Sequence, residues 1–244
     1  MKRAYADLHL LPNPRDLEQV SRIVSKALEL GYKFVGIPLP QNFQQEEIQK
    51  LKSLCAESGI DFVSRVDLKP RSPKELIRDL RKLRRKFELV AVLCTSKSVA
   101  RQAAKDRRVD LLNFPVTDFR KRFFDRAEAE LASNALASLE IDVKPLLTLE
   151  GLARARFIQN LRGEATTAIE YGVPIVVSSG VADEKLMRKP MEQASLTFLF
   201  DLDEATALKT VSKNPIAIMK RNREKLSPKF IAPGIRVIRR GKDC

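Results

Sequence analysis

Four ionisable residues in two short apolar segments are the strongest candidates for chemistry in this chain. Asp7 and His9 alternate with apolar residues in segment 5–10, and Arg65 and Asp67 do so in segment 61–68. Because successive strand residues point to opposite faces, the four side chains should point away from the covering helices. There they would form either a metal site or a cluster in which the acids pair with arginine and imidazole. Both interpretations stay open.

His9 is the only histidine among 244 residues, and this limits the chemistry. Acid–base catalysis near neutral pH and many metal sites rely on imidazole. Metal-dependent phosphoesterases built on α/β barrels use several histidines, and one cannot fill their ligand positions. We therefore predict no catalytic residue, no bound metal and no bound cofactor. The alternative is a metal-dependent phosphoesterase that uses Asp7, His9 and Asp67.

Short apolar segments alternate with segments of helical periodicity along the whole chain. The expected strands are residues 5–10, 34–38, 61–68, 88–94, 109–114, 139–143 and 174–178. The expected helices are residues 14–30, 43–58, 73–86, 97–105, 123–138, 149–171, 190–200 and 214–226. Seven βα units in this length predict an α/β fold of TIM-barrel type, a closed or nearly closed (β/α) barrel with extra C-terminal helices. We expect one domain, residues 1–244, ending in a basic arm at 234–244.

Composition excludes several other classes of protein. No apolar run approaches the roughly 20 residues of a membrane span, and Asp7 and His9 interrupt any signal-peptide core. Neither a Walker motif nor a dinucleotide-binding glycine motif follows a strand. Three widely spaced cysteines, at positions 55, 94 and 244, predict neither a disulfide framework nor a zinc site. We expect a cytoplasmic protein without a membrane partner.

Positive charge is concentrated in two segments. The formal net charge is +14; residues 65–108 carry 15 Lys and Arg against 5 Asp and Glu, and residues 213–242 carry 10 against 1. Such local excess attracts phosphates and releases their counterions on binding. The chain has no tryptophan, so base stacking is a poor alternative mechanism. Nucleic acid is the predicted partner.

Two stripes run along the expected helix 73–86. The apolar stripe is Leu76, Leu80, Leu83 and Phe87. The cationic stripe, at the same spacings and two positions earlier, is Lys74, Arg78, Arg81 and Arg85. One side should pack on the sheet and the other should present cations. A solvated helix face is the alternative, but only Glu75 and Asp79 offer local partners to its basic residues.

A turn after the last expected strand adds a third candidate region. Ser178, Ser179 and Gly180 offer hydroxyl and backbone N–H groups that could hold a phosphate, with Arg188 a few residues away; a plain turn is the alternative. The predicted RNA-binding residues are Lys69, Arg71, Lys74, Arg78, Arg81, Arg85, Arg101, Lys105, Arg107, Arg108, Ser178, Ser179, Gly180, Arg188, Lys220, Arg221, Arg223 and Lys225.

Several motifs occur in the order of a known family. They are Asp7-Leu8-His9, Gly31-Tyr32, Ser178-Ser179-Gly180 with Arg188 and Pro190, and Asn214-Pro215 followed by Arg221-Asn222 and Lys225. In these motifs the chain resembles the archaeal and eukaryotic ribonuclease P protein subunit of TIM-barrel type. Val181 departs from the small residue expected after Ser-Ser-Gly. The family resembles the polymerase-and-histidinol-phosphatase barrels in fold.

The resemblance implies a noncatalytic subunit that supports RNA-catalysed removal of the 5′ leader from precursor tRNA. It implies as partners the ribonuclease P RNA, a small protein subunit in a 2:2 heterotetramer, and other ribonuclease P proteins. Mg²⁺ is expected at the RNA. Two alternatives remain open: the phosphoesterase described above, and a general nucleic-acid-binding scaffold.

Overall fold

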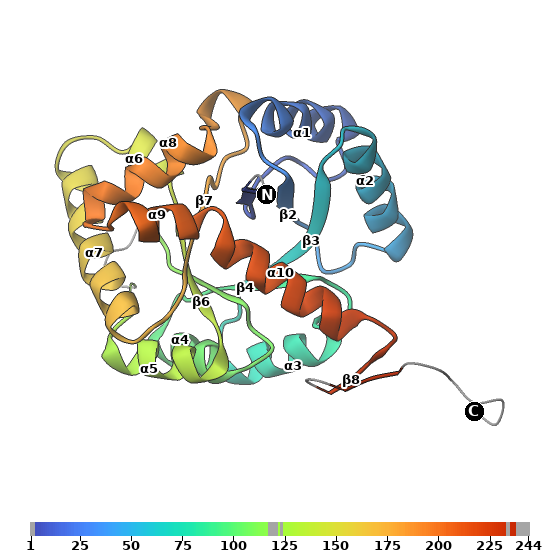
Figure 1. The fold of residues 1–244 in the computed structure, drawn as a ribbon. Helices are drawn as coiled ribbons and strands as arrows, with labels where there is room; N and C mark the ends of the chain where they lie inside the picture. The colour runs from blue at the N-terminus through green and yellow to red at the C-terminus, as the bar shows by residue number, and fades with distance from the viewer. Residues whose placement is uncertain (1–2, 117–121, 123, 233–234, 238–244) are drawn as a thin grey trace.

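The computed structural model describes residues 3–116, 122, 124–232 and 235–237 and shows a nearly closed α/β barrel (Figure 1). Seven parallel strands pair in chain order: β1 (Ala6–Asp7), β2 (Phe34–Pro38), β3 (Asp61–Leu68), β4 (Leu89–Leu93), β5 (Leu111–Asn113), β6 (Ser138–Asp142) and β7 (Ile175–Ser178). The predicted barrel is therefore confirmed.

Helices surround the strands on the outside. They are α1 (Leu17–Leu30), α2 (Gln45–Glu57), α3 (Pro73–Leu83), α4 (Lys97–Lys105), α5 (Arg126–Ala135), α6 (Lys144–Thr148), α7 (Gly151–Glu170), α8 (Pro190–Ser195), α9 (Glu204–Thr210) and α10 (Lys213–Leu226), with 3₁₀ turns at Glu184–Leu186 (η2) and Leu196–Phe200 (η3). The apolar stripe predicted for α3 is buried. Its capping residue Ser72 accepts a hydrogen bond from the N–H of Glu75, which fixes where the helix begins.

The barrel closes between its first and last strands through a few contacts. Leu10 and Val181 form an isolated parallel bridge, and the N–H of Gly180 donates to the carbonyl of His9 at 2.9 Å. Beside β1, a Cβ atom at Gly36 would collide with the carbonyl of Leu8, so only glycine allows this close approach. The first strand is therefore held close to the rest of the sheet although it is short.

Helix α10 crosses the amino-terminal end of the barrel (Figure 1). Ile218 and Met219 are buried there and join the apolar interior formed by residues of β1, β3, β4, β5 and β7. The side chain of Asn214 donates to the carbonyl of Ile175 at 2.8 Å, and that of Asn222 to the carbonyl of Glu88 at 2.9 Å. The extra C-terminal helix thus caps the barrel.

Element boundaries differ from the prediction in a few places. The helix expected at 123–138 ends at Ala135, where Leu136 adopts a left-handed conformation (φ 63°) and β6 starts two residues later. The segment expected as one helix at 190–200 is α8 followed by η3. Helices α6 and α9 were not predicted, because five and seven residues are too few for a clear helical period.

The structure describes only part of the basic arm that the sequence predicts at the C-terminus. Within the expected basic arm at 234–244, Ile235–Arg236 forms β9 and pairs with β8 (Phe230–Ala232); residues 234 and 238–244 lie outside the described residues. Cys55 and Cys94 are buried free thiols. Among the helices that the structure describes, none combines the length and apolar character needed to cross a membrane.

Candidate functional site: a buried polar cluster and a cationic surface

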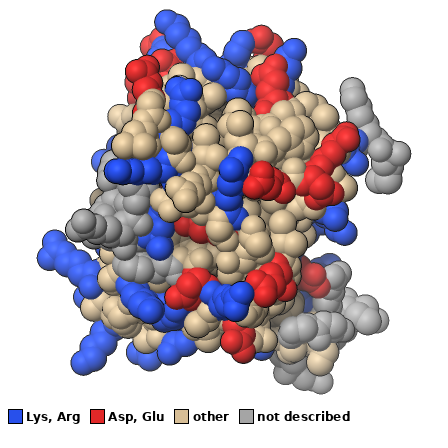
Figure 2. Space-filling view, turned by 90° about the vertical axis from the view of Figure 1, so that its left-hand side faces the viewer, with Lys and Arg blue, Asp and Glu red and all other residues tan. Residues whose placement is uncertain are grey.

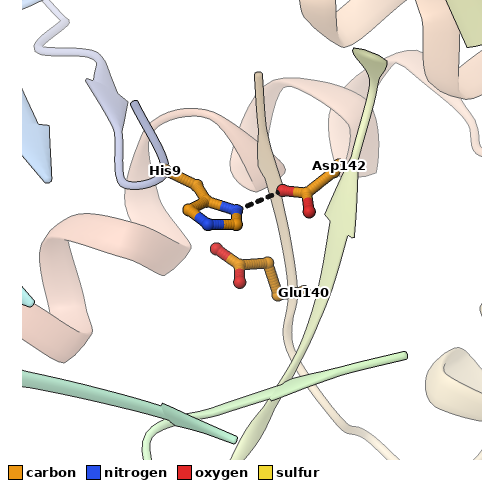
Figure 3. A group of neighbouring side chains, drawn as sticks. All are labelled: His9, Glu140 and Asp142. Carbon is orange, nitrogen blue, oxygen red and sulfur yellow. Dashed lines mark hydrogen bonds and ion pairs between the residues drawn. The ribbon is translucent and has the colours of Figure 1, made fainter. Parts of the chain in front are cut away.

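A buried polar cluster fills the carboxyl-terminal end of the barrel. His9 Nδ1 lies 2.7 Å from Asp142 Oδ1, and His9 Nε2 lies 3.1 Å from Asp67 Oδ2. Arg65 donates from Nε to Asp67 Oδ1 at 2.6 Å and from Nη1 and Nη2 to the two oxygens of Glu140 at 2.6 and 2.7 Å. Figure 3 shows the imidazole and the two carboxylates of β6 converging. Of the four residues predicted to cluster, His9, Arg65 and Asp67 are bonded to one another through Asp67, and β6 contributes two further acids.

Neighbouring strands satisfy most of the remaining hydrogen-bonding groups of this cluster. Asn113 Nδ2 donates to Glu140 Oε2 at 3.0 Å and to Asp142 Oδ2 at 3.1 Å. Ser178 Oγ donates to Glu140 Oε1 at 2.9 Å. Asp7 Oδ1 accepts from backbone N–H groups, while its buried Oδ2 has no hydrogen-bond partner among the described residues.

The protonation of the cluster follows from its internal pairing. Burial and Arg65 disfavour a charged imidazole, but Asp142 and Asp67 outweigh both and raise the pKa of His9 from 6.5 to about 10. Burial alone would raise the pKa of Asp67, yet Arg65 and His9 hold it well below its ordinary value. Burial raises the pKa of Asp7. His9 is therefore a buried cation at neutral pH.

The same residues include a possible ligand set for a metal ion. One ligand atom each from His9, Glu140 and Asp142 lie within 4.8 Å of one another. However, both imidazole nitrogens hold carboxylates and the Arg65 guanidinium pairs with Glu140 through two bonds. A protonated imidazole cannot ligate a metal. The donor set therefore fits an internally paired cluster better than a metal site.

The turn after β7 does not expose the phosphate-binding groups expected of it. Ser178 and Ser179 are at most 1% exposed, and a Cβ at Gly180 would press against the side chain of Asp142. The Ser179 N–H donates to Asp7 Oδ1 at 3.1 Å. Arg188, the charge expected beside this turn, donates instead to the carbonyls of Lys185 and Met187. These groups are buried or bonded to other residues of the protein. The turn therefore does not present the phosphate-binding site that the sequence predicted.

Apart from Arg188, the predicted RNA-binding cations divide into two sets by their contacts. Five of them are bonded to carboxylates within the protein, although the sequence predicted them to contact RNA: Arg78, Arg101, Arg108, Arg221 and Arg223. Nine are exposed and have no side-chain hydrogen bond or ion pair within the described part of the chain: Lys69, Arg71, Lys74, Arg81, Arg85, Lys105, Arg107, Lys220 and Lys225.

Charges are mixed on the side of the molecule that carries α7. Figure 2 shows acidic and basic groups interleaved there, around a central area of mostly uncharged residues. Leu152 and Ile169 of α7 and Phe198 and Leu199 of η3 are exposed apolar side chains on these elements. A polyanion is better matched by the exposed cations of α3 and α4.

A family model decides the membership of the chain. The model described as RNase P subunit p30 matches residues 4–227, nearly the whole chain. The chain belongs to this family. Relatives named ribonuclease P protein component 3 include one from Methanosarcina barkeri, 29% identical over 96% of this chain and 95% of its own length, and one from Methanosarcina acetivorans, 30% identical over 74% of each.

Solved structures agree on the fold of this p30 family member. A chain in a cryo-EM structure of archaeal ribonuclease P with mature tRNA matches with a TM-score of 0.82 and 21% identity, covering 97% of this chain and 99% of that one. A putative prolidase from Bifidobacterium longum matches with a TM-score of 0.59 and 13% identity, over 91% and 70% of the two chains. The barrel is thus shared with proteins of other kinds.

Three residues of the cluster were missed from the sequence. Glu140 and Asp142 alternate with Leu139 and Ile141 along β6, which is the same two-residue period that identified Asp7 and His9. Applying that rule to the sixth segment would have found both acids. Asn113, at the end of β5, carries no charge and gives no comparable signal.

Proposed function

We propose that this chain is a noncatalytic, RNA-binding subunit of ribonuclease P. In this role it supports the removal of the 5′ leader of precursor tRNA by the RNA of the complex. Membership in the p30 family supports the assignment to ribonuclease P. The observation that carries the RNA-binding role is the set of nine exposed cations whose side chains pair with no other residue in the described ranges.

Unpaired cations bind a phosphate backbone with the smallest free-energy penalty. An arginine that already holds a carboxylate must give up that contact before it binds a phosphate, whereas a solvated one only releases counterions. Lys74, Arg81 and Arg85 are exposed on or just beyond α3 and are therefore the first contacts that we assign to RNA. Arg78, on the same face, is paired with Glu75 and Asp79.

Catalysis by this chain is not part of the proposal. In the alternative phosphoesterase, Asp7, His9 and Asp67 would have to bind a metal or move protons near neutral pH. The pairing of His9 with two carboxylates and of Arg65 with Asp67 and Glu140 argues against both roles. We assign the hydrolytic Mg²⁺ ions to the RNA.

Replacing Lys74, Arg81 and Arg85 together by glutamine tests the RNA contact. If each neutralises one phosphate, the slope of log binding constant against log salt should become shallower by about 2–3, because each contact contributes roughly 0.7–0.9. The probe is the ribonuclease P RNA of the source organism. An unchanged affinity and slope would refute the assignment of α3.

A matched control separates this effect from loss of net charge. Lys26, Lys50 and Lys189 lie on or beside α1, α2 and α8, outside both basic segments. Their replacement by glutamine removes the same charge and should leave the salt slope unchanged. An unstructured RNA of equal length distinguishes the favoured function from a general nucleic-acid scaffold, which would bind both RNAs alike.

We also infer that the chain assembles with a small ribonuclease P protein subunit as a 2:2 heterotetramer. The family resemblance supports this stoichiometry, and the relatives carry the name of a ribonuclease P protein component. Light scattering of the chain alone and of the chain with that subunit tests it. A 1:1 mass at concentrations well above the dissociation constant would contradict it.

A further inference from the structure

The two basic segments of the sequence meet where α10 crosses the amino-terminal end of the barrel. Arg84 follows α3, Arg107 follows α4, and Arg221 and Lys225 lie one turn apart on α10. The first pair belongs to segment 65–108 and the second to segment 213–242, more than 100 residues further along.

One buried carboxylate joins the two segments. Asp110, 1% exposed, has its Oδ1 2.9 Å from Arg221 Nη2 and its Oδ2 3.4 Å from Arg84 Nη1. Arg221 also donates to the carbonyl of Leu136 at 2.9 Å, and Arg84 donates to the carbonyl of Phe87 at 3.3 Å. Both guanidinium groups are therefore held in fixed positions.

The other two cations near this crossing of α10, Arg107 and Lys225, are exposed. Arg107 and Lys225 have no side-chain hydrogen bond or ion pair with any described residue. Asp106, the acid next to Arg107 in sequence, is already bonded to Arg108 at 2.7 Å. Asp110 thus contributes one negative charge beside the four positive charges of Arg84, Arg107, Arg221 and Lys225.

The pKa of Lys225 reflects the charges of Arg84, Arg107 and Arg221, so the four cations lie close enough to interact. Burial, Arg221, Arg84 and Arg107 lower the pKa of Lys225, while Asp110 opposes them. Repulsion among fixed cations is relieved when an anion binds between them.

We propose that Arg84, Arg107, Arg221 and Lys225 form a phosphate-binding site for the RNA backbone at the amino-terminal end of the barrel. The inference rests on the proposed RNA-binding function and adds a location to it. RNA would cross the capped end of the barrel next to α3, and not the end that holds the polar cluster. Arg107 and Lys225 would contact the phosphates directly, whereas Arg84 and Arg221, which already hold Asp110, would add positive potential from fixed positions.

The decisive variant removes only the exposed members, Arg107 and Lys225. Because neither side chain bonds to another residue that the structure describes, R107Q/K225Q should melt within about 2 °C of the wild type, as surface substitutions usually change stability little. Its binding to the ribonuclease P RNA should show a salt slope shallower by about 1.4–1.8 than that of the wild type. The control K50Q/K189Q loses the same charge on α2 and beside α8 and should keep the wild-type slope.

Each outcome has a distinct meaning. Wild-type protein with no salt-dependent affinity for this RNA would refute the proposed function itself. Wild-type binding with an unchanged slope for R107Q/K225Q would overturn only the site. A variant that keeps its RNA slope but loses the small protein subunit, by light scattering, would assign these cations to an acidic protein surface and would also overturn the site.

Discussion

His9 combines two properties that rarely occur together, nearly complete burial and positive charge. Asp142 and Asp67 hold its two ring nitrogens, and the same Asp67 also accepts from Arg65. A charge in the interior is tolerated only when such partners replace the lost water. The ring therefore serves as a structural cation that ties β1 to β3 and β6. Its titration should be visible in the stability of the protein.

Stability should fall as pH rises above neutrality. The pKa of His9 is raised in the folded state, so its contribution is fully present below the unfolded value of 6.5 and is lost as pH rises through about 10. Within this window His9 alone should reduce the free energy of unfolding by at most about 1.4 kcal/mol per pH unit. Urea unfolding at pH 7, 8 and 9 measures the slope. The slope should be smaller in His9→Gln, and equal slopes in both proteins would contradict the assignment.

Arg65 should be more sensitive to substitution than any surface cation. Its side chain is fully buried and bonded to Glu140, Asp67 and the carbonyl of Leu8. Arg65→Met leaves Glu140 without a cation and Asp67 with His9 alone, and should cost about 3–5 kcal/mol. Adding Glu140→Gln should recover part of this loss, because one of the stranded charges is then removed. Urea unfolding of the four proteins of this cycle gives the coupling; purely additive effects would show that the pair is not coupled.

At the scale of elements, α10 decides how the amino-terminal end of the barrel is closed. Arg223 donates to both oxygens of Asp61 at 2.7 Å and to Glu88 at 3.1 and 3.2 Å. Asp61 is the first residue of β3 and Glu88 directly precedes β4. An arginine predicted to face RNA thus fixes the capping helix on two strands.

Arg223→Ala should therefore lower stability, and Arg81→Ala should not. Loss of charged hydrogen bonds at a group that is one-third exposed should cost about 1–2 kcal/mol. Arg81 is exposed on α3 and pairs with no described residue, so Arg81→Ala should change the free energy of unfolding by no more than about 0.5 kcal/mol. Thermal unfolding of both variants measures this difference. Equal melting temperatures would mean that the Arg223 contacts do not anchor α10.

Local patterns predicted the strands and most helices, whereas the roles of charged residues depended on the folded chain. Strands β2 and β3 match their predicted segments residue for residue, because apolar alternation is a local property. The pairing of Arg223 with Asp61 joins positions 162 residues apart, and no local pattern indicates it. Periodicity places a cation on a helix face but does not reveal the acid that faces it.

At the scale of the whole molecule, the two ends of the barrel have opposite characters. The carboxyl-terminal end holds acids that are matched internally by Arg65 and His9. The amino-terminal end carries α10 and the cations that surround Asp110. Enzymes built on this type of barrel place their active sites at the first of these ends. Here that end is occupied by structural ion pairs, and the positive surface lies elsewhere.

This distribution predicts how the protein changes the Mg²⁺ requirement of the RNA. Exposed cations that neutralise phosphates reduce the repulsion that opposes a compact RNA, so less Mg²⁺ is needed for the same fold. In a reconstituted complex, the Mg²⁺ concentration for half-maximal leader removal should rise several-fold when Lys74, Arg81 and Arg85 are replaced by glutamine. The rate at saturating Mg²⁺ should stay close to that of the wild type, because the proposal assigns these residues to RNA folding and not to the cleavage step. A lower rate that excess Mg²⁺ fails to restore would show instead that α3 acts on the catalytic step, and the electrostatic account of this subunit would then be wrong.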